Sequence, residues 1–177
     1  PGPVMLAPQI KELLAADMIH HRSPLLSQDL EVCFQYLPAI FACDGKVLCM
    51  TSTGSGAMQA SISNFIKKED KAIIIVSGKF GERWQKILEA HSDHAIVIRV
   101  EWGENIDLEE LNKIVQQNPD VKALYTQACE TSTGHMHPVA EISKILKSHA
   151  PDALMVVDGI TTILTSDFDM TRDLVDI

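Results

Sequence analysis

The sequence lacks the features that would place it in a membrane or nucleic-acid-binding class. No apolar run approaches the roughly 18 residues of a membrane-spanning helix, and the opening PGPVMLAPQI has no basic flank and no apolar signal core. Its 15 basic residues are outnumbered by 24 acidic ones, and the net charge of −9 argues against binding to nucleic acid or to an anionic membrane surface. We therefore expect a cytoplasmic protein of 177 residues, with one sizeable core, that binds neither nucleic acid nor membrane.

Metal and nucleotide motifs are missing as well. The four cysteines form no C-x-x-C pair, no histidines accompany them at a zinc-finger spacing, and His135 and His137 have no further ligands at a suitable spacing. The cysteines are therefore expected to be reduced, mostly buried thiols, and no metal site is predicted. Neither a Walker A loop nor G-x-G-x-x-G is present, so any phosphate site has to come from another pattern.

Apolar runs rich in β-branched residues alternate with segments of helical period. This alternation predicts β-α-β units, a mostly parallel sheet and a three-layer α/β/α sandwich. The expected strands are 46–50, 71–76, 95–100, 121–127 and 153–158, with 174–177 beginning another, and the expected helices are 28–42, 55–67, 80–91, 107–118 (N-capped by Asp107) and 138–149 (with Pro138 at the first helical position).

Ligands bind such sheets at the carboxyl ends of the strands, so the loops that follow the strands are the places to look. The loop TSTGSGA places Thr53, Gly54 and Ser55 at the start of the helix 55–67. A helix start offers free N–H groups and the positive end of a dipole to an anion, and glycine lets the backbone come close. The same pattern is equally typical of an ordinary N-capped helix.

Three further strand-end loops carry candidate side chains. Phe80 in SGKFGER could stack on a flat ligand or pack against the start of its helix, and Thr131 in ETSTG could donate to a ligand or form a local turn. Asp158 ends the apolar run ALMVVD, where a carboxylate needs a partner. That partner could be a helix N-terminus, an internal Arg or Lys, or the protonated ring nitrogen of a ligand. An anion site, a stacking surface, a donor and a buried carboxylate are together what pyridoxal 5'-phosphate requires.

The sequence also resembles a known family. PGPV, HHRSP, TSTGSGAMQA, SGKFGERW, VEWGE, ETSTG, HPVAEI and VVDGITT occur in the order found in class V, fold-type I aminotransferases that include alanine–glyoxylate and serine–glyoxylate (serine–pyruvate) enzymes. The resemblance covers essentially the whole chain, and the joint occurrence of these motifs is far more specific than any one of them.

This resemblance implies a role for each candidate residue. Thr53, Gly54 and Ser55 would hold the phosphate of pyridoxal 5'-phosphate, and Phe80 would stack on its pyridine ring. Thr131 would hydrogen-bond the phenolic oxygen of the ring, and Asp158 would pair with its nitrogen. A loop near the mouth of the active site and the dimer interface would contain His21, Arg22 and Ser23.

The resemblance also implies what the whole enzyme does. It would be a homodimer that transfers an amino group from a small amino acid, alanine or serine, to a 2-oxo acid, glyoxylate or pyruvate. Residues 1–20 would form an arm, and residues 21–177 the first portion of the large domain that binds pyridoxal phosphate. The Schiff-base lysine and the small domain would follow Ile177, so this chain alone is expected to be inactive. The alternatives are a lyase or cysteine desulfurase-like enzyme of the same fold and a non-catalytic truncated paralogue.

Overall fold

The computed structural model describes residue 2 and residues 4–177, so Pro1 and Pro3 of the PGPV motif lie outside the described residues. These residues form two compact units, 1–47 and 48–177. The first unit contains α1 (Pro8–Leu14) and α2 (Pro24–Phe41). Ser23 caps the longer helix α2, because its Oγ accepts a hydrogen bond from the N–H of Leu26 over 3.2 Å.

The second unit is an α/β domain built on a parallel sheet, which confirms the predicted fold class, and the strands lie in the order β2-β1-β3-β6. Its strands are β1 (Lys71–Val76), β2 (His94–Arg99), β3 (Ala123–Gln127) and β6 (Leu154–Asp158). The helices are α3 (Gly54–Phe65), α4 (Lys79–His91), α5 (Leu108–Gln117) and α6 (Val139–His149). The short strands β4 (Cys129–Glu130) and β5 (His135–Met136) form a two-stranded antiparallel hairpin.

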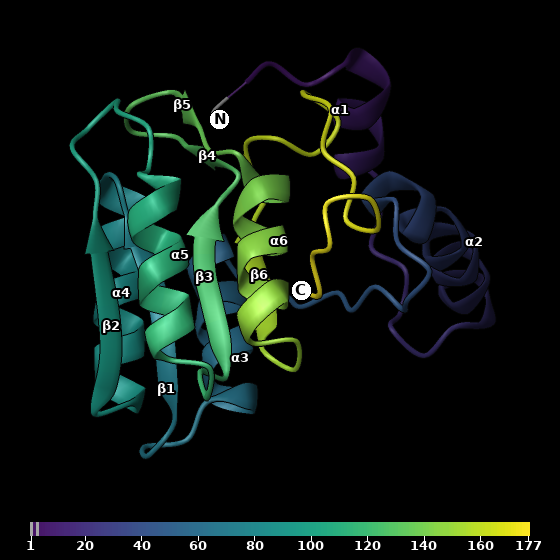
Figure 1. Ribbon diagram of the computed structural model, residues 1–177. Coiled ribbons are helices and arrows are strands. Elements are labelled where there is room, and N and C mark those ends of the chain that lie inside the picture. Colours follow the sequence, from purple (N-terminus) through teal and green to yellow (C-terminus); the bar gives the residue numbers. More distant parts are fainter. Residues whose placement is uncertain (1, 3) are drawn as a thin grey trace. The chain divides into compact units, whose positions relative to one another are not determined.

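The helices cover both faces of this sheet and make three layers. One face of the sheet packs with Leu111 of α5 and Leu146 of α6, and the other packs with Ile62 of α3 and Leu88 of α4. Figure 1 shows α5 and α6 in front of the sheet and α3 and α4 behind it. Because β1 is covered on both faces, its residues Ala72–Val76 are all buried, which accounts for its continuous apolar sequence.

Two predicted helix starts agree with the structure to within one residue. Asp107 is the N-cap of α5 and accepts hydrogen bonds from the N–H groups of Glu109 and Glu110, over 2.8 and 3.1 Å. Pro138 is the N-cap of α6 and not its first helical residue.

The strand predicted at 46–50 is wrong. These residues form neither helix nor strand, and the side chain of Leu48 is 86% exposed. An apolar, β-branched pattern forms a strand only where a neighbouring strand supplies hydrogen bonds and packing. The expectation of mostly buried cysteines is also wrong, because Cys33 and Cys49 are exposed and the other two are partly exposed.

The segment 174–177 is not a regular strand, but its backbone follows β6. The N–H groups of Asp176 and Ile177 donate to the carbonyl of Met155, and the N–H of Val157 donates to the carbonyl of Ile177 over 2.8 Å. These bonds have the alternation of a parallel pair. None of the helices in the described part of the chain is both long and apolar enough to cross a bilayer.

Candidate active site

The start of α3 offers two backbone donors. Thr53 is its N-cap, and its carbonyl already accepts from the N–H groups of Gly56 and Ala57, over 2.9 and 3.3 Å. The N–H groups of Gly54 and Ser55 have no acceptor among the described residues, as expected for the first turn of a helix. The Thr53 side chain makes no capping hydrogen bond. This helix end therefore keeps the donors that an anion would use.

Glycine permits close packing in this turn. A Cβ on Gly56 would overlap the Oγ of Ser52, and a Cβ on Gly54 would lie 3.3 Å from the Cδ1 of Ile160, a tight but adjustable contact. The second distance places the start of α3 against the loop that follows β6. The loop before α3 and the loop after β6 are far apart in the sequence, and they thus meet at the carboxyl end of β6.

Arg83 links α3 to α4. Its Nη1 donates to the Oγ of Ser55 over 2.8 Å, and its guanidinium lies 5.1 Å from the centre of the Phe80 ring. Phe80 is partly buried and packs against the core between α3, α4 and the sheet. An arginine beside a helix start adds a full positive charge to the free N–H groups there. The sequence interpretation missed this residue, although it lies three positions after Phe80, on the same side of a helix.

Asp158 ends β6 at the same edge. Its Oδ1 accepts a hydrogen bond from the N–H of Ile160 over 3.0 Å, and it has no salt-bridge partner among the described residues. Burial raises the pKa of the Asp158 carboxyl, and the nearby charge of Glu130 adds to that rise. The hydrogen bond from Ile160 and the charge of Arg83 oppose it. The described residues therefore supply this carboxylate with a local N–H donor and with no cation at salt-bridge distance.

The neighbour of Asp158 in the sheet register is Gln127, at the end of β3. Gln127 is 1% exposed, and neither polar atom of its side chain has a hydrogen-bond partner among the described residues. Buried polar groups in proteins are nearly always satisfied, so this amide is an unusual feature of the carboxyl end of β3.

Thr131 lies at the tip of the β4–β5 hairpin. Its Oγ1 lies 2.5 Å from the Oγ1 of Thr161, which follows Asp158 by three residues. The hydroxyl predicted to face a ligand is therefore tied to the loop that carries the candidate carboxylate. Thr161 lies in the motif VVDGITT, but the sequence interpretation did not identify it as a candidate site residue.

Glu130 is the most important residue that the sequence interpretation did not identify. It is completely buried at the base of the same hairpin. One oxygen, Oε2, accepts from the N–H groups of Phe80 and Gly81 over 3.2 and 3.0 Å, and Oε1 accepts from the N–H and Oγ of Ser132 over 3.1 and 2.7 Å. Its carboxylate therefore joins the hairpin to the start of α4.

A second buried polar pair lies beside these loops. The Oγ of Ser77 lies 2.7 Å from the Nε2 of His137, and the Nδ1 of His137 is buried with no partner in the part of the chain that the structure describes. Burial, helped by the nearby charge of His135, lowers the pKa of His137 to about 4, and Glu130 acts in the opposite direction. The imidazole is thus neutral at neutral pH, and the pair ties the end of β1 to the start of α6.

The loop His21–Arg22–Ser23 belongs to the first unit. The rings of His20 and His21 stack with their centres 4.5 Å apart, and the N–H of Arg22 donates to the Nδ1 of His20 over 3.2 Å. Ser23 acts as the cap of α2 described above. The predicted role of this loop at an active-site mouth stays a prediction.

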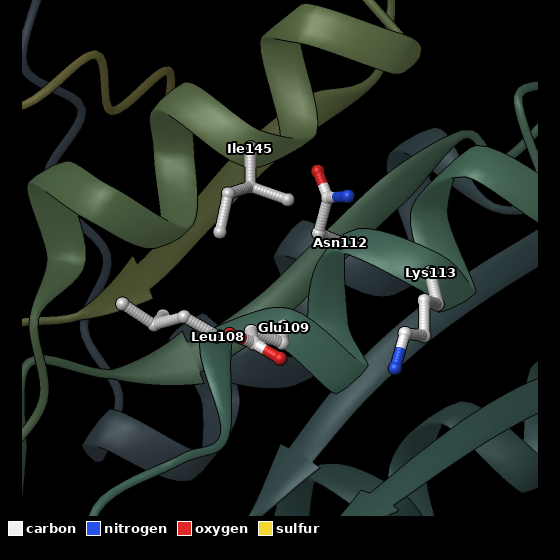
Figure 2. A pocket seen from close by; sticks show the side chains of 5 residues that line it. All are labelled: Leu108, Glu109, Asn112, Lys113 and Ile145. Atoms are coloured by element: carbon white, nitrogen blue, oxygen red, sulfur yellow. The ribbon is translucent and has the colours of Figure 1, made fainter.

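An open groove of about 420 Å³ lies elsewhere, on the outer side of α5 and α6. Figure 2 shows Ile145 of α6 and four side chains of α5 around it: Leu108, Glu109, Asn112 and Lys113. It lies on the opposite face of the sheet from α3 and α4 and contains none of the predicted site residues. Its side chains offer no nucleophile beside a general base.

The geometry defines a class of protein: an α/β domain with two free N–H donors at the start of α3 and with an aromatic ring and a largely buried carboxylate beside them. Residues 14–177 match the family model described as "Aminotransferase class-V". The chain belongs to the class V aminotransferase family, whose members depend on pyridoxal phosphate.

Individual relatives agree with this assignment. An uncharacterized aminotransferase of Methanocaldococcus jannaschii is 36% identical over 92% of this chain and 42% of its own length. A serine–glyoxylate aminotransferase of Hyphomicrobium methylovorum is 28% identical over 96% of this chain and 43% of its own length. The crystal structure of a subgroup IV aspartate aminotransferase from Thermus thermophilus superposes with a TM-score of 0.91 at 28% identity, over 99% of this chain and 49% of that one. The chain spans somewhat less than half the length of the relatives it matches.

Proposed function

We propose that the complete protein containing this chain is a homodimeric enzyme that uses pyridoxal 5'-phosphate to transfer an amino group from a small amino acid to a 2-oxo acid. Alanine or serine is the proposed donor, and glyoxylate or pyruvate the proposed acceptor. The similarity to a serine–glyoxylate aminotransferase supports this substrate class.

One observation carries the proposal: Ile160 connects the two ends of the candidate site. Its N–H donates to Asp158 over 3.0 Å. Its Cδ1 would lie 3.3 Å from a Cβ placed on Gly54. A carboxylate and a helix start with free donors therefore both lie beside the same residue. A cofactor with a phosphate at one end and a basic ring nitrogen at the other needs this pairing.

The residues fit that cofactor. The N–H groups of Gly54 and Ser55 and the hydroxyl of Thr53 would hold the phosphate, with Arg83 adding charge. Phe80 would stack on the ring, Thr131 would donate to its phenolic oxygen, and Asp158 would hold a proton on the ring nitrogen. When bound, the cofactor supplies an electron sink that makes the Cα–H bond of an amino acid acidic. The loop His21–Arg22–Ser23 would lie near the mouth of the site.

The test replaces Asp158 in the complete protein. Asp158→Asn keeps the size of the side chain and removes its charge, so it should weaken cofactor binding modestly. It should slow single-turnover amino transfer from alanine or serine by about a hundredfold, the scale of losing one strong electrostatic contact with a reacting centre. Asp152→Asn, which removes an exposed carboxylate before the other end of β6, is the matched control and should leave both quantities unchanged.

Two results would contradict the proposal at different points. If the wild-type protein binds no pyridoxal phosphate, measured by absorbance after dialysis, the whole function is wrong. If the cofactor binds and Asp158→Asn transfers amino groups at the wild-type rate, Asp158 is only a structural acceptor for the N–H of Ile160.

A further inference from the structure

The start of α4 has no cap of its own. Its N-cap residue is Gly78, which has no side chain to accept from the first N–H groups of the helix. There is also no room for a side chain at position 78, because a Cβ on Gly78 would lie 2.5 Å from the Oγ of Ser132 and 2.6 Å from the Cδ of Glu130. The β4–β5 hairpin, some fifty residues later in the chain, occupies the space where a cap would be.

Glu130 and Ser132 take over the capping of this helix. The Oγ of Ser132 accepts from the N–H of Lys79 over 3.1 Å, and Oε2 of Glu130 accepts from the N–H groups of Phe80 and Gly81. Three successive donors of the first turn are thereby satisfied. A fully buried carboxylate on a helix N-terminus is favoured both by these hydrogen bonds and by the helix dipole.

This arrangement has a consequence for the two helix starts at this edge of the sheet. The donors of α4 are occupied by a side chain of the protein, whereas the N–H groups of Gly54 and Ser55 at the start of α3 are free. A phosphate would therefore find donors at α3 and a negative charge at α4.

We propose that Glu130 is a positioning residue that holds the backbone under the Phe80 ring and the loop of Thr131 as one unit, an inference that rests on the proposed cofactor function. In the proposed function, Phe80 and Thr131 contact the cofactor, whereas Glu130 contacts neither substrate nor cofactor. It acts through the N–H of Phe80 on one side and through Ser132, which follows Thr131, on the other. Loss of the hydrogen bonds of Glu130 would free the Phe80 ring and the Thr131 hydroxyl together.

A double-mutant cycle in the complete protein separates this role from a general effect on folding. The dissociation constant of pyridoxal phosphate is measured by titration for the wild type, Glu130→Gln, Phe80→Ala and the double variant. Glutamine has nearly the same size, but its NH₂ group cannot accept from an N–H, so one side of the network is lost. Residues that act through each other are non-additive, whereas independent ones add.

We expect Glu130→Gln to raise the dissociation constant about tenfold with Phe80 present, and less than about threefold when Phe80 is already alanine. Glu69→Gln is the matched control, because Glu69 is exposed in the loop between α3 and β1, and it should change nothing in either background. Ser132→Ala leaves the carboxylate in place and removes one of its donors. It should give a smaller loss with the same dependence on Phe80.

The outcomes decide separately on the inference and on the function. A wild-type protein that binds no pyridoxal phosphate overturns both. A wild type that binds, with an equal effect of Glu130→Gln in both backgrounds, overturns the positioning role alone and leaves the proposed function standing. If Glu130→Gln fails to fold, the cycle with Ser132→Ala and Phe80→Ala decides by the same criterion.

Discussion

His137 should make the stability of this protein depend on pH in the mildly acid range. His137 is 5% exposed, its Nε2 lies 2.7 Å from the Oγ of Ser77, and its Nδ1 has no partner among residue 2 and residues 4–177. Replacing it by glutamine removes the titrating group, while the amide can still hydrogen-bond to the hydroxyl of Ser77. The comparison of interest is therefore the pH dependence of stability with and without an imidazole at position 137.

The expected size follows from the pKa of His137, which burial lowers from 6.5 to about 4. Between these two values the unfolded chain binds a proton that the folded protein does not, so the free energy of unfolding falls as the pH falls. For a group with these two pKa values, the loss between pH 7 and pH 5 is about 2 kcal/mol. It reaches about 3 kcal/mol below pH 4, where both states are protonated.

The assay is urea denaturation of the complete protein at pH 7 and pH 5. The fluorescence of Trp84, which is buried against Tyr125 with ring centres 4.9 Å apart, reports on this domain. Between the two pH values, His137→Gln should lose about 2 kcal/mol less than the wild type. His94→Gln is the matched control, because His94 is exposed and its imidazole is solvated in both states; this variant should keep the wild-type dependence.

The reasoning is refuted if His137→Gln and the wild type lose the same free energy of unfolding between pH 7 and pH 5. That result would mean that the folded protein accommodates the protonated imidazole. The partner would then be the carboxylate of Glu130, the nearby group whose charge favours protonation of His137.

Two further substitutions test local features of the fold. Gly81→Ala places a Cβ 2.8 Å from the Cα of Val76 in β1, so the overlap should outweigh the gain in helix propensity and lower the free energy of unfolding by roughly 1–3 kcal/mol. A more stable variant in urea denaturation would show that the strand gives way, and Gly45→Ala, where a Cβ meets nothing within 4 Å, is the control. Asp107→Ala removes the acceptor for the N–H groups of Glu109 and Glu110 and should cost about 1 kcal/mol in the same assay. An unchanged midpoint would mean that water replaces the cap.

Local patterns in the sequence were sufficient for most of the α/β domain. The run KAIIIV predicts a strand buried on both faces, and β1 has that burial, because only a continuous apolar run can face helices on either side. The cap Asp107 is equally local, since a carboxylate and the N–H groups it accepts from lie within three residues. The segment 46–50 has the same kind of pattern without the same structure, because strand formation depends on a neighbour that the pattern does not contain.

The composition of the candidate site could also be read from the sequence. The glycine and hydroxyl residues at 53–55, Phe80, Thr131 and Asp158 all follow from turn chemistry, the alternation of strands and helices, and the order of the motifs. The sequence by itself thus determined the family, the layers of the fold and the loops that form the candidate site.

Only the tertiary structure decided how these loops are held together. Glu130 caps a helix that begins some fifty residues earlier, Arg83 reaches Ser55 in another helix, and Ile160 donates to Asp158 while its Cδ1 lies beside Gly54. Each residue stood inside a recognised motif, but neither periodicity nor local spacing relates positions so far apart. Hydrogen bonds depend on distance and direction in space, so the partner of a buried carboxylate is known only once the chain has folded around it.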